Sequence, residues 1–292
     1  MKTVEMYMEE IAKKRRQLQT ISIFCFALLI AITVLFFYRI RAVAFVTYAL
    51  LLLFYFLWFR RQRQSYSDLI AEAQLRFGLC KNDPEAKYIG RSGPTVAEFD
   101  QMGILPIQQD EHGLLLRQGF AYQEDGLGIR GWEIAFHFLN GSNAKNKYDF
   151  LSGSLIEIQL ADDPGNLLMF NDIVLSERHR VAFTDRLGFS PVQAADLKDI
   201  FVYSDHPENI NPEIFEKIST LLKAAPRISA LRLRPGCVLV FMQNRFYTTN
   251  VKVRDLPTQK QLESNPLPEI EPIKAFCLSL HAPQTSSPQD NA

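Results

Sequence analysis

The sequence predicts an α+β fold, with an N-terminal two-helix transmembrane hairpin followed by a cytoplasmic, largely antiparallel α+β domain. Two uncharged apolar runs, residues 21–38 and 42–59, follow one another with only residues 39–41 between them. From about residue 104, the spacing of apolar residues changes from helical to alternating, which is typical of strands. The later elements do not repeat as βαβ units, and this order favours antiparallel pairing.

Residues 1–20 are predicted to form a short amphiphilic helix ahead of the first run. Glu9 precedes Lys13 by four residues, and the same spacing recurs one position later, in the order that stabilises a helix. Four consecutive basic residues then meet the membrane surface: Lys13, Lys14, Arg15 and Arg16. We interpret them as a solvated charged face that sets orientation; specific lipid recognition is the alternative.

The two apolar runs are long enough to cross a bilayer as helices. Crossing the hydrocarbon takes about 20 apolar residues, and a helix satisfies its own backbone groups there. Neither run contains Asp, Glu, Lys, Arg or His, so buried core helices are a poor alternative. The short connection predicts antiparallel neighbours. Tyr38 and Trp58 lie near the ends, where amphipathic rings favour the interface.

The distribution of lysine and arginine predicts the orientation. Basic residues are concentrated before the first run and after the second, whereas the turn holds only Arg39 and Arg41. Because basic flanks mark the cytoplasmic side, we expect a multi-pass inner-membrane protein with both termini in the cytoplasm. The turn arginines can extend to the far headgroups. The predicted membrane-interface residues are Lys13, Lys14, Arg15, Arg16, Arg39, Arg41, Trp58, Arg60 and Arg61.

A cleaved signal peptide is the rival interpretation of the N-terminal segment. Ala42, Val43 and Ala44 match a small-x-small cleavage site. However, Arg41 immediately precedes this site and the apolar run continues past it. We therefore favour a retained membrane hairpin.

The net charge of zero conceals an asymmetry between the two parts of the chain. Residues 1–64 contain 10 Lys and Arg against 3 Asp and Glu, whereas residues 65–292 contain 22 against 29. Nucleic-acid binding depends on basic residues that neutralise phosphates. The acidic second part of the chain therefore argues against a nucleic-acid-binding function. About 200 residues remain for one domain or two small ones.

The four cysteines predict neither a disulfide framework nor a zinc site. Cys25, Cys80, Cys237 and Cys277 are scattered, and no two of them form a CxxC pair. This pattern is typical of a reducing cytoplasm. A catalytic thiol is the alternative to four small apolar residues.

The first elements after the hairpin are predicted to be helices, followed by strands. A helix over residues 65–78 has Gly78 as its stop, residues 82–84 form a turn, and residues 94–102 form a short helix with Val96 and Phe99 inward. A half-buried strand has Trp132, Ile134, Phe136 and Phe138 on one face. The other predicted strands cover residues 114–117, 120–123, 154–160, 167–170, 180–183 and 200–203, with a turn at 162–166.

The last third of the chain is predicted to contain two helices and three strands. Asn211, Pro212 and Glu213 open a helix as N-cap, first-turn proline and acidic first-turn residue. Strands follow at 228–233, 238–242 and 246–249, then a proline-rich loop at 256–272, a helix at 273–280 and a disordered tail. The predicted regions are 1–20, 21–59, 60–103, 104–281 and 282–292.

The GxGxxG at Gly126, Gly128 and Gly131 is the strongest match to a functional motif. A dinucleotide site needs a strand before this motif and a helix after it. Here an alternating, strand-like stretch follows, so we interpret the glycines as a loose hairpin turn.

No other motif predicts catalytic, cofactor-binding or metal-ligating residues. The five histidines, at positions 112, 137, 179, 206 and 281, lack metal-ligand spacing. His206 lies in a polar stretch after a strand, which is also what a strand-to-helix loop looks like. Asp162 and Asp163 fit a turn tip better than a cation site.

One segment of the domain resembles a known family. The residues Ile-Phe-Val-Tyr-Ser-Asp at 200–205 precede a proline-led helix at 210–218, and a strand pair around 238–242 follows. This order, behind a basic helix and two close spans, resembles the bacterial membrane family catalogued as Domain of Unknown Function 3137. The glycine-rich turn at 126–131 and the sparse stretch at 161–179 depart from its pattern. The resemblance implies a membrane protein with a cytoplasmic domain and a possible LemA-type protein partner, and no catalytic residue.

Three functions compete on the sequence alone. A membrane-anchored interaction module fits the tight hairpin and the acidic domain. A membrane-tethered enzyme or ligand sensor is motivated by the polar loops at 141–147 and 204–211. A channel built from oligomerised hairpins is disfavoured because the uncharged spans offer no polar pathway.

Overall fold

The computed structural model describes residues 3–38, 41–80, 83, 85–107, 113–139, 148–172, 174–193, 197, 199–244 and 256–280. These residues fall into two compact units: the first lies within 1–81 and 248–266, and the second within 82–247 and 267–292. The chain therefore leaves the first unit, builds the second, returns to the first and ends in the second.

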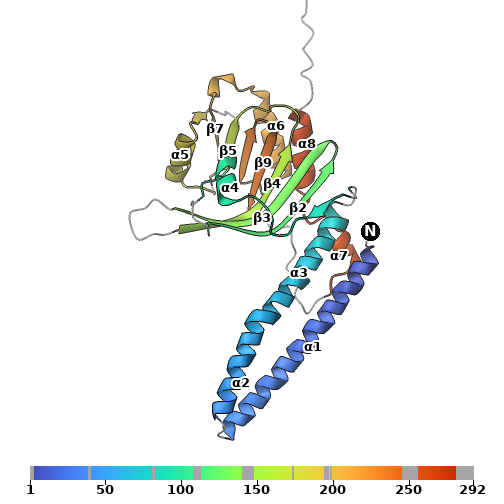
Figure 1. The fold of residues 1–292 in the computed structure, drawn as a ribbon. Coiled ribbons are helices and arrows are strands. Elements are labelled where there is room, and N and C mark those ends of the chain that lie inside the picture. The colour runs from blue at the N-terminus through green and yellow to red at the C-terminus, as the bar shows by residue number, and fades with distance from the viewer. Residues whose placement is uncertain are drawn as a thin grey trace, which may run out of the picture. The chain divides into compact units, whose positions relative to one another are not determined.

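The first unit is built from long helices that pack against one another (Figure 1). Helix α1 (Val4–Phe37) is continuous, so the predicted N-terminal helix and the first apolar run form one element. The Thr3 hydroxyl caps it by accepting a hydrogen bond from the Met6 amide at 3.4 Å. The returning chain is helical from residue 41 to residue 79, as α2 (Arg41–Phe54), the π-helical turn η1 (Tyr55–Phe59), α3 (Arg60–Gln74) and the π-helical turn η2 (Leu75–Leu79).

A short helix from late in the chain completes this unit. Helix α7 (Gln259–Glu263) contacts α1, α3 and η2, and its Leu262 is fully buried. The loop predicted over residues 256–272 is therefore wrong, because Thr258 and Gln261 form a reciprocal capping box that starts α7. The buried cluster of the unit contains Tyr7, Ile11, Leu18, Tyr66, Leu69, Ile70, Ala73 and Leu262.

The second unit is an α+β domain around one antiparallel sheet, as predicted. The nine strands run in the order β1-β2-β3-β4-β9-β8-β5-β7-β6, and every described pairing is antiparallel. The strands are β1 (Lys87–Tyr88), β2 (Leu114–Glu124), β3 (Leu127–Leu139), β4 (Tyr148–Gln159), β5 (Leu167–Asn171), β6 (Ser190–Val192), β7 (Ile200–Ser204), β8 (Ala230–Arg234) and β9 (Cys237–Gln243).

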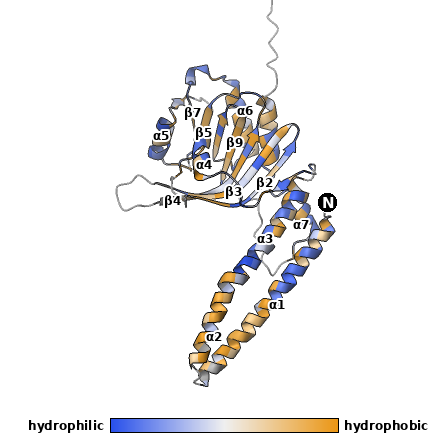
Figure 2. Cartoon of the chain, viewed as in Figure 1, coloured by the Kyte–Doolittle hydropathy of each residue, from blue (hydrophilic) through white to orange (hydrophobic). Residues whose placement is uncertain are grey.

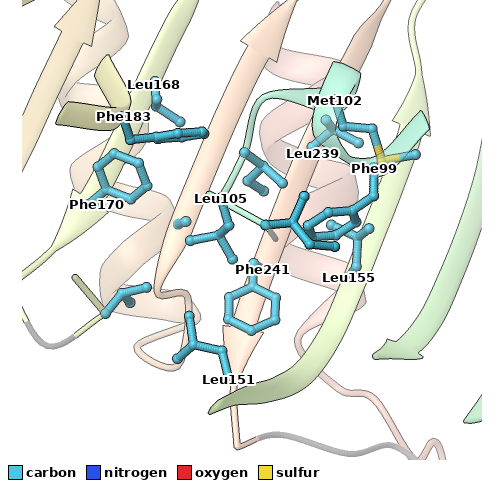
Figure 3. Packing of buried hydrophobic residues seen from close by; sticks show 14 of the residues in the cluster. Phe99, Met102, Leu105, Leu151, Leu155, Leu168, Phe170, Phe183, Leu239 and Phe241 are labelled. Carbon is cyan, nitrogen blue, oxygen red and sulfur yellow. The ribbon is translucent and has the colours of Figure 1, made fainter. Parts of the chain in front are cut away.

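Helices lie on both sides of this sheet (Figure 1). Helix α4 (Val96–Met102) lies in front of it with Phe99 fully buried, as predicted. Figure 3 shows the apolar layer between α4 and the strands, including Leu105, Leu155, Leu239 and Phe241. Helices α6 (Glu213–Ala224) and α8 (Ile270–Leu280) contact each other behind the strands. Because both faces are covered, Glu133 is as buried as its neighbour Trp132, and β3 is not half-buried as expected.

Two further predictions about this unit are wrong. The strands expected at 114–117 and 120–123 are one strand, β2, interrupted by a register shift between Leu116 and Gln118. Residues 180–183 lie in helix α5 (Glu177–Arg186), whose buried positions Arg180, Phe183 and Thr184 follow helical spacing. Short runs of mixed residues do not distinguish helix from strand, and here tertiary packing selects the helix.

The glycine-rich motif is divided between a turn and a strand. Asp125 and Gly126 have φ values of 53° and 79°, and they form the two-residue hairpin turn between β2 and β3. Gly128 and Gly131 pair with Gln159 and Ile156 in the middle of the sheet. Strand β3 continues after the motif, whereas a dinucleotide site would need a helix there.

Some predictions lie outside the described residues. They are the strand at 246–249, the tail at 282–292, the loop at 141–147, His112, His281 and most of the turn at 82–84.

Candidate membrane interface

The first unit exposes a long band of apolar side chains. On α1, Ile23, Phe24 and Phe26 are 65–70% exposed, and on the returning helix Phe45 is 75% exposed. Figure 2 shows that hydrophobic residues predominate along both helices near the α1–α2 turn. In water such a band would be very costly, because soluble proteins rarely expose large contiguous apolar surfaces.

Helix α1 is long and apolar enough to cross a membrane over residues 4–34, and it is the one helix among the described residues that is. A helix of this kind near an N-terminus is also typical of a signal sequence. The second run begins in α2 and continues through η1, and neither element reaches that length alone.

Two threonine hydroxyls inside the band form hydrogen bonds within their own helices. The Thr33 hydroxyl donates to the Leu29 carbonyl at 2.9 Å, and the Thr47 hydroxyl donates to the Val43 carbonyl at 2.8 Å. These bonds satisfy the hydroxyls internally, which a hydrocarbon environment requires.

The structure brings some of the predicted interface residues together. A cleft of about 250 Å³ between α1 and the returning helix is lined by Lys14, Gln17, Leu18, Ile21, Trp58 and Gln62. Trp58 stacks on Phe54 with ring centroids 5.2 Å apart, and Lys14 Nζ donates to Ser65 Oγ at 2.6 Å. A lysine and an indole therefore line the same cleft where the apolar band ends.

The other predicted interface residues are spread around this level or lie outside the description. Lys13 and Arg16 are exposed on α1, Arg15 is half-buried, and Arg60 and Arg61 are exposed at the start of α3. Arg39 is outside the described residues, as is the side chain of Arg41. The exposed arginines and lysines form a basic end to the band.

A buried hydrogen bond fixes α1 against α3 beyond this basic end. Tyr7 is 2% exposed, and its hydroxyl donates to Glu72 Oε1 at 2.7 Å. Burial, with the hydrogen bond and the charge of Glu72, raises the pKa of Tyr7 to about 12. The sequence offered no signal for this pair, because its members lie 65 residues apart.

We expect Tyr7→Phe to lower the stability of the first unit by about 1–2 kcal/mol, since it removes a hydrogen bond to a charged acceptor. The measurement is thermal unfolding of the full-length protein in detergent. The matched control is Tyr48→Phe, because Tyr48 is exposed on α2. Equal melting temperatures for Tyr7→Phe and the wild type would contradict the assignment.

Neither unit presents a metal site among the described residues. His179 Nδ1 lies 2.6 Å from Ser176 Oγ, and His206 Nδ1 lies 3.5 Å from Glu208 Oε1 at an exposed position. The carboxylate of Asp163 accepts from the Gly165 amide, which makes it part of a turn as predicted. These contacts are those of loops and helix starts.

Comparison with known proteins gives no relative for this chain: no family model, curated protein or solved structure matches it.

Proposed function

We propose that this chain is an integral membrane protein whose first unit is a two-helix anchor and whose second unit is a cytoplasmic interaction module. The exposed apolar band of α1 and the returning helix carries the proposal. The two helices lie side by side in contact, and their uncharged stretches meet at the same turn. A hairpin that crosses and returns puts both stretches in hydrocarbon.

The basic end of the band supports the proposed orientation. Lys14, Arg60 and Arg61 lie on the side of the band that leads to the second unit, together with the rest of the basic cluster. Basic residues are retained on the cytoplasmic side. The second unit is then cytoplasmic, a reducing compartment in which thiols such as those of its Cys237 and Cys277 persist.

The second unit is the proposed recognition element. Residues 65–292 carry seven more acidic than basic residues, so a basic protein surface is the partner that their charge favours. The LemA-type partner implied by the family resemblance belongs to this proposal. A membrane-tethered ligand sensor is the second candidate, and the cleft described in the next subsection favours it.

Lysine substitutions in the band test the anchor. Phe26 and Phe45 are 67% and 75% exposed, so Phe26→Lys with Phe45→Lys removes little packing and would be harmless in a soluble protein. In a bilayer, a lysine near the middle of a span, as in Phe26→Lys, costs about 2.5–3.5 kcal/mol, and one near the end of a span, as in Phe45→Lys, costs less. We therefore expect the double variant to lose resistance to extraction from membranes by alkaline carbonate.

Met6→Lys is the matched control, because Met6 is an exposed apolar residue outside the band. We expect it to remain in the membrane fraction like the wild type. N-terminal sequencing of the membrane-bound protein checks that the hairpin is retained. A mature chain that begins after residue 44, or a wild-type chain released by carbonate, would refute the anchor.

Crosslinking in native membranes tests the interaction module. The full-length protein is purified after mild crosslinking, in parallel with a variant that carries an unrelated hairpin of equal length. A near-stoichiometric protein recovered with both hairpins would place recognition in the second unit. Recovery of no protein with either hairpin would count against the module.

A further inference from the structure

The second unit contains a cleft of about 530 Å³ lined by both apolar and charged side chains. Strands β2, β3, β4 and β8 provide its floor, and α4 with the segment before it provides a wall. Its lining includes Ser92, Glu98, Arg130, Trp132, Glu157 and Arg234. This volume is within the range of small-molecule sites, which combine an apolar wall with a few fixed polar groups.

Trp132 is a fixed wall of this cleft. Its indole Nε1 donates to the Ser92 carbonyl at 3.1 Å, and the residue is 3% exposed. Gly93 and Gly119 lie so close that a Cβ at either position would come within 2.7 Å of the indole. Two glycines and a hydrogen bond therefore hold the ring in one orientation, and the wall is preformed.

The floor carries an ion pair and a second arginine. Arg130 and Glu157 face each other across β3 and β4, with Arg130 Nε 3.2 Å from Glu157 Oε2. Arg234 lies beyond them on β8, next to Cys237; burial raises the pKa of the Cys237 thiol, although the positive charge of Arg234 lowers it in part. Among the described residues, no carboxylate lies within ion-pair distance of Arg234. Its guanidinium is a charged donor that lines the cleft.

A buried arginine adds positive charge beside Arg234. Arg232 is two residues away on the same face of β8, is 8% exposed and stacks over Phe189 at 4.3 Å. Its Nε and Nη1 have no hydrogen-bond partner in the described structure. Burial lowers the pKa of Arg232 to about 10, although the charge of Asp205 raises it in part. A buried cation without a full set of partners is costly, and a bound anion would offset that cost.

The remaining acidic group of the cleft is already engaged. Glu98 Oε2 accepts from both the amide and the hydroxyl of Thr95, at 2.7 and 2.9 Å, and these bonds hold the pKa of Glu98 below its usual value. Glu157 neutralises Arg130. Arg234 is therefore the arginine of the lining that no described carboxylate pairs with at ion-pair distance, and Arg232 lies next to it on the same strand.

We propose that this cleft binds a small, water-soluble molecule that bears a carboxylate or phosphate, with its oxyanion on Arg234 and its body against Trp132. A guanidinium presents paired N–H donors that match the two oxygens of such a group. The outer N–H groups of Arg130, which is 43% exposed, provide further donors. The proposal goes beyond the membrane anchor and does not depend on it.

Trp132 reports binding directly. The chain has two tryptophans, so Trp58→Phe leaves Trp132 as the single emitter in the full-length protein in detergent. The probes are sodium phosphate and sodium citrate, with sodium chloride at matched ionic strength as the reference for screening. We expect a saturable change in Trp132 emission with at least one oxyanion probe and none with chloride.

Substitutions at Arg234 separate binding from general charge effects. In the same background, we expect Arg234→Gln to weaken the apparent affinity by about tenfold or more, because a charged hydrogen-bond donor is lost. Arg234→Lys keeps the charge without the paired donors and is expected to give an intermediate affinity. Arg227→Gln is the matched control, because this arginine is 61% exposed and outside the cleft.

Two results would overturn the proposal. One is the absence of a saturable response to both oxyanion probes while the melting temperature shows a folded protein. The other is an equal response in Arg234→Gln and Arg227→Gln. An unfolded Arg234→Gln protein would leave Arg234→Lys as the deciding variant, since an affinity equal to that of the parent would show that Arg234 does not hold the anion.

Discussion

Replacing Lys274 by methionine is expected to destabilise the second unit by about 3 kcal/mol, because it removes a buried cation and leaves the partly buried Glu124 carboxylate without its partner. Lys274 Nζ lies 2.6 Å from Glu124 Oε2, 3.1 Å from Glu271 Oε2 and 3.7 Å from Asp125 Oδ2. The lysine side chain is 7% exposed and that of Glu124 is 16% exposed. This ion cluster joins α8 to the β2–β3 hairpin. In a domain of this size the loss corresponds to a fall of roughly 6–12 °C in melting temperature.

The Lys274 cluster also predicts how the difference depends on pH. Burial lowers the pKa of Lys274, but the hydrogen bonds and charges of Glu124 and Glu271 raise it more, so the pKa lies above its usual value. A raised lysine pKa stabilises the fold fully below the unfolded value of about 10.4, and this stabilisation is lost as pH rises through the folded value. The difference in unfolding free energy between the wild type and Lys274→Met should persist at neutral pH and decrease only in strong alkali.

Lys217→Met is the matched control for this prediction. Lys217 Nζ donates to the Ser279 carbonyl at 2.8 Å, so it also joins a neighbouring element to α8, but through a neutral acceptor. We expect it to cost about 1 kcal/mol. Thermal unfolding of the full-length proteins in detergent, in the Trp58→Phe background and followed by Trp132 emission, measures both. Equal losses for the two variants would show that the ion cluster adds nothing beyond a single hydrogen bond.

Local signals in the sequence were sufficient for much of the second unit. The Asp125 and Gly126 pair is a strong hairpin signal, because the required turn needs positive φ at both positions. Asn211 before Pro212 correctly predicted a helix here, although α6 begins at Glu213 with Pro212, not Asn211, as its N-cap residue; the Asn211 side chain accepts from the Glu213 amide at 3.0 Å. The α4 helix and strands β5, β7, β8 and β9 are also confirmed, with ends shifted by one or two residues. Each of these elements depends on residues that are close in sequence.

The predictions that were wrong, and the features that no sequence pattern indicated, depend on residues that are far apart in the sequence. Helix α5 was predicted as a strand, because only the tertiary fold shows that Arg180 and Phe183 are buried on one side of a helix. The sheet order places β5 beside β8 and β7, and no local pattern encodes it. The cleft draws its donors from Arg130 and Arg234, which are far apart in sequence. The polar loop at 204–211 that motivated a ligand sensor is not among the lining residues, and the loop at 141–147 lies outside the described residues.

The contact that joins the late segment of the chain to the first unit predicts a second large effect. Gly78 lies in η2, and a Cβ placed there would be 2.3 Å from the Ser264 carbonyl oxygen, just after α7. The obstacle is backbone, so it cannot be relieved by a change of side-chain rotamer. We expect Gly78→Ala to force α7 away from η2 and to cost about 1–3 kcal/mol, as overpacking of a well-packed site does.

Whether Gly78→Ala lowers or raises the stability is the test, because helix propensity alone predicts that alanine stabilises the helix. Gly78 was predicted as a helix stop, yet η2 continues to Leu79 and Gly78 has no positive φ. In a helix without neighbours, alanine would be more stable than glycine by about 1 kcal/mol. A stabilised Gly78→Ala protein would therefore show that α7 does not pack here, whereas a destabilised one supports the contact.

Local opening of α7 gives this prediction a second readout. Lys260 is exposed on α7, so trypsin can cut there once the helix separates from η2. We expect faster cleavage after Lys260 in Gly78→Ala than in the wild type, measured by mass spectrometry of the full-length protein in detergent. Ser67→Ala, a half-buried position on α3, is the control and should leave the cleavage rate unchanged. In the sequence, α7 lies between the two segments that build the second unit. Its release would remove the contacts of α7 with α1, α3 and η2 that hold the first unit together. Cleavage after Lys260 would report that loss before global unfolding.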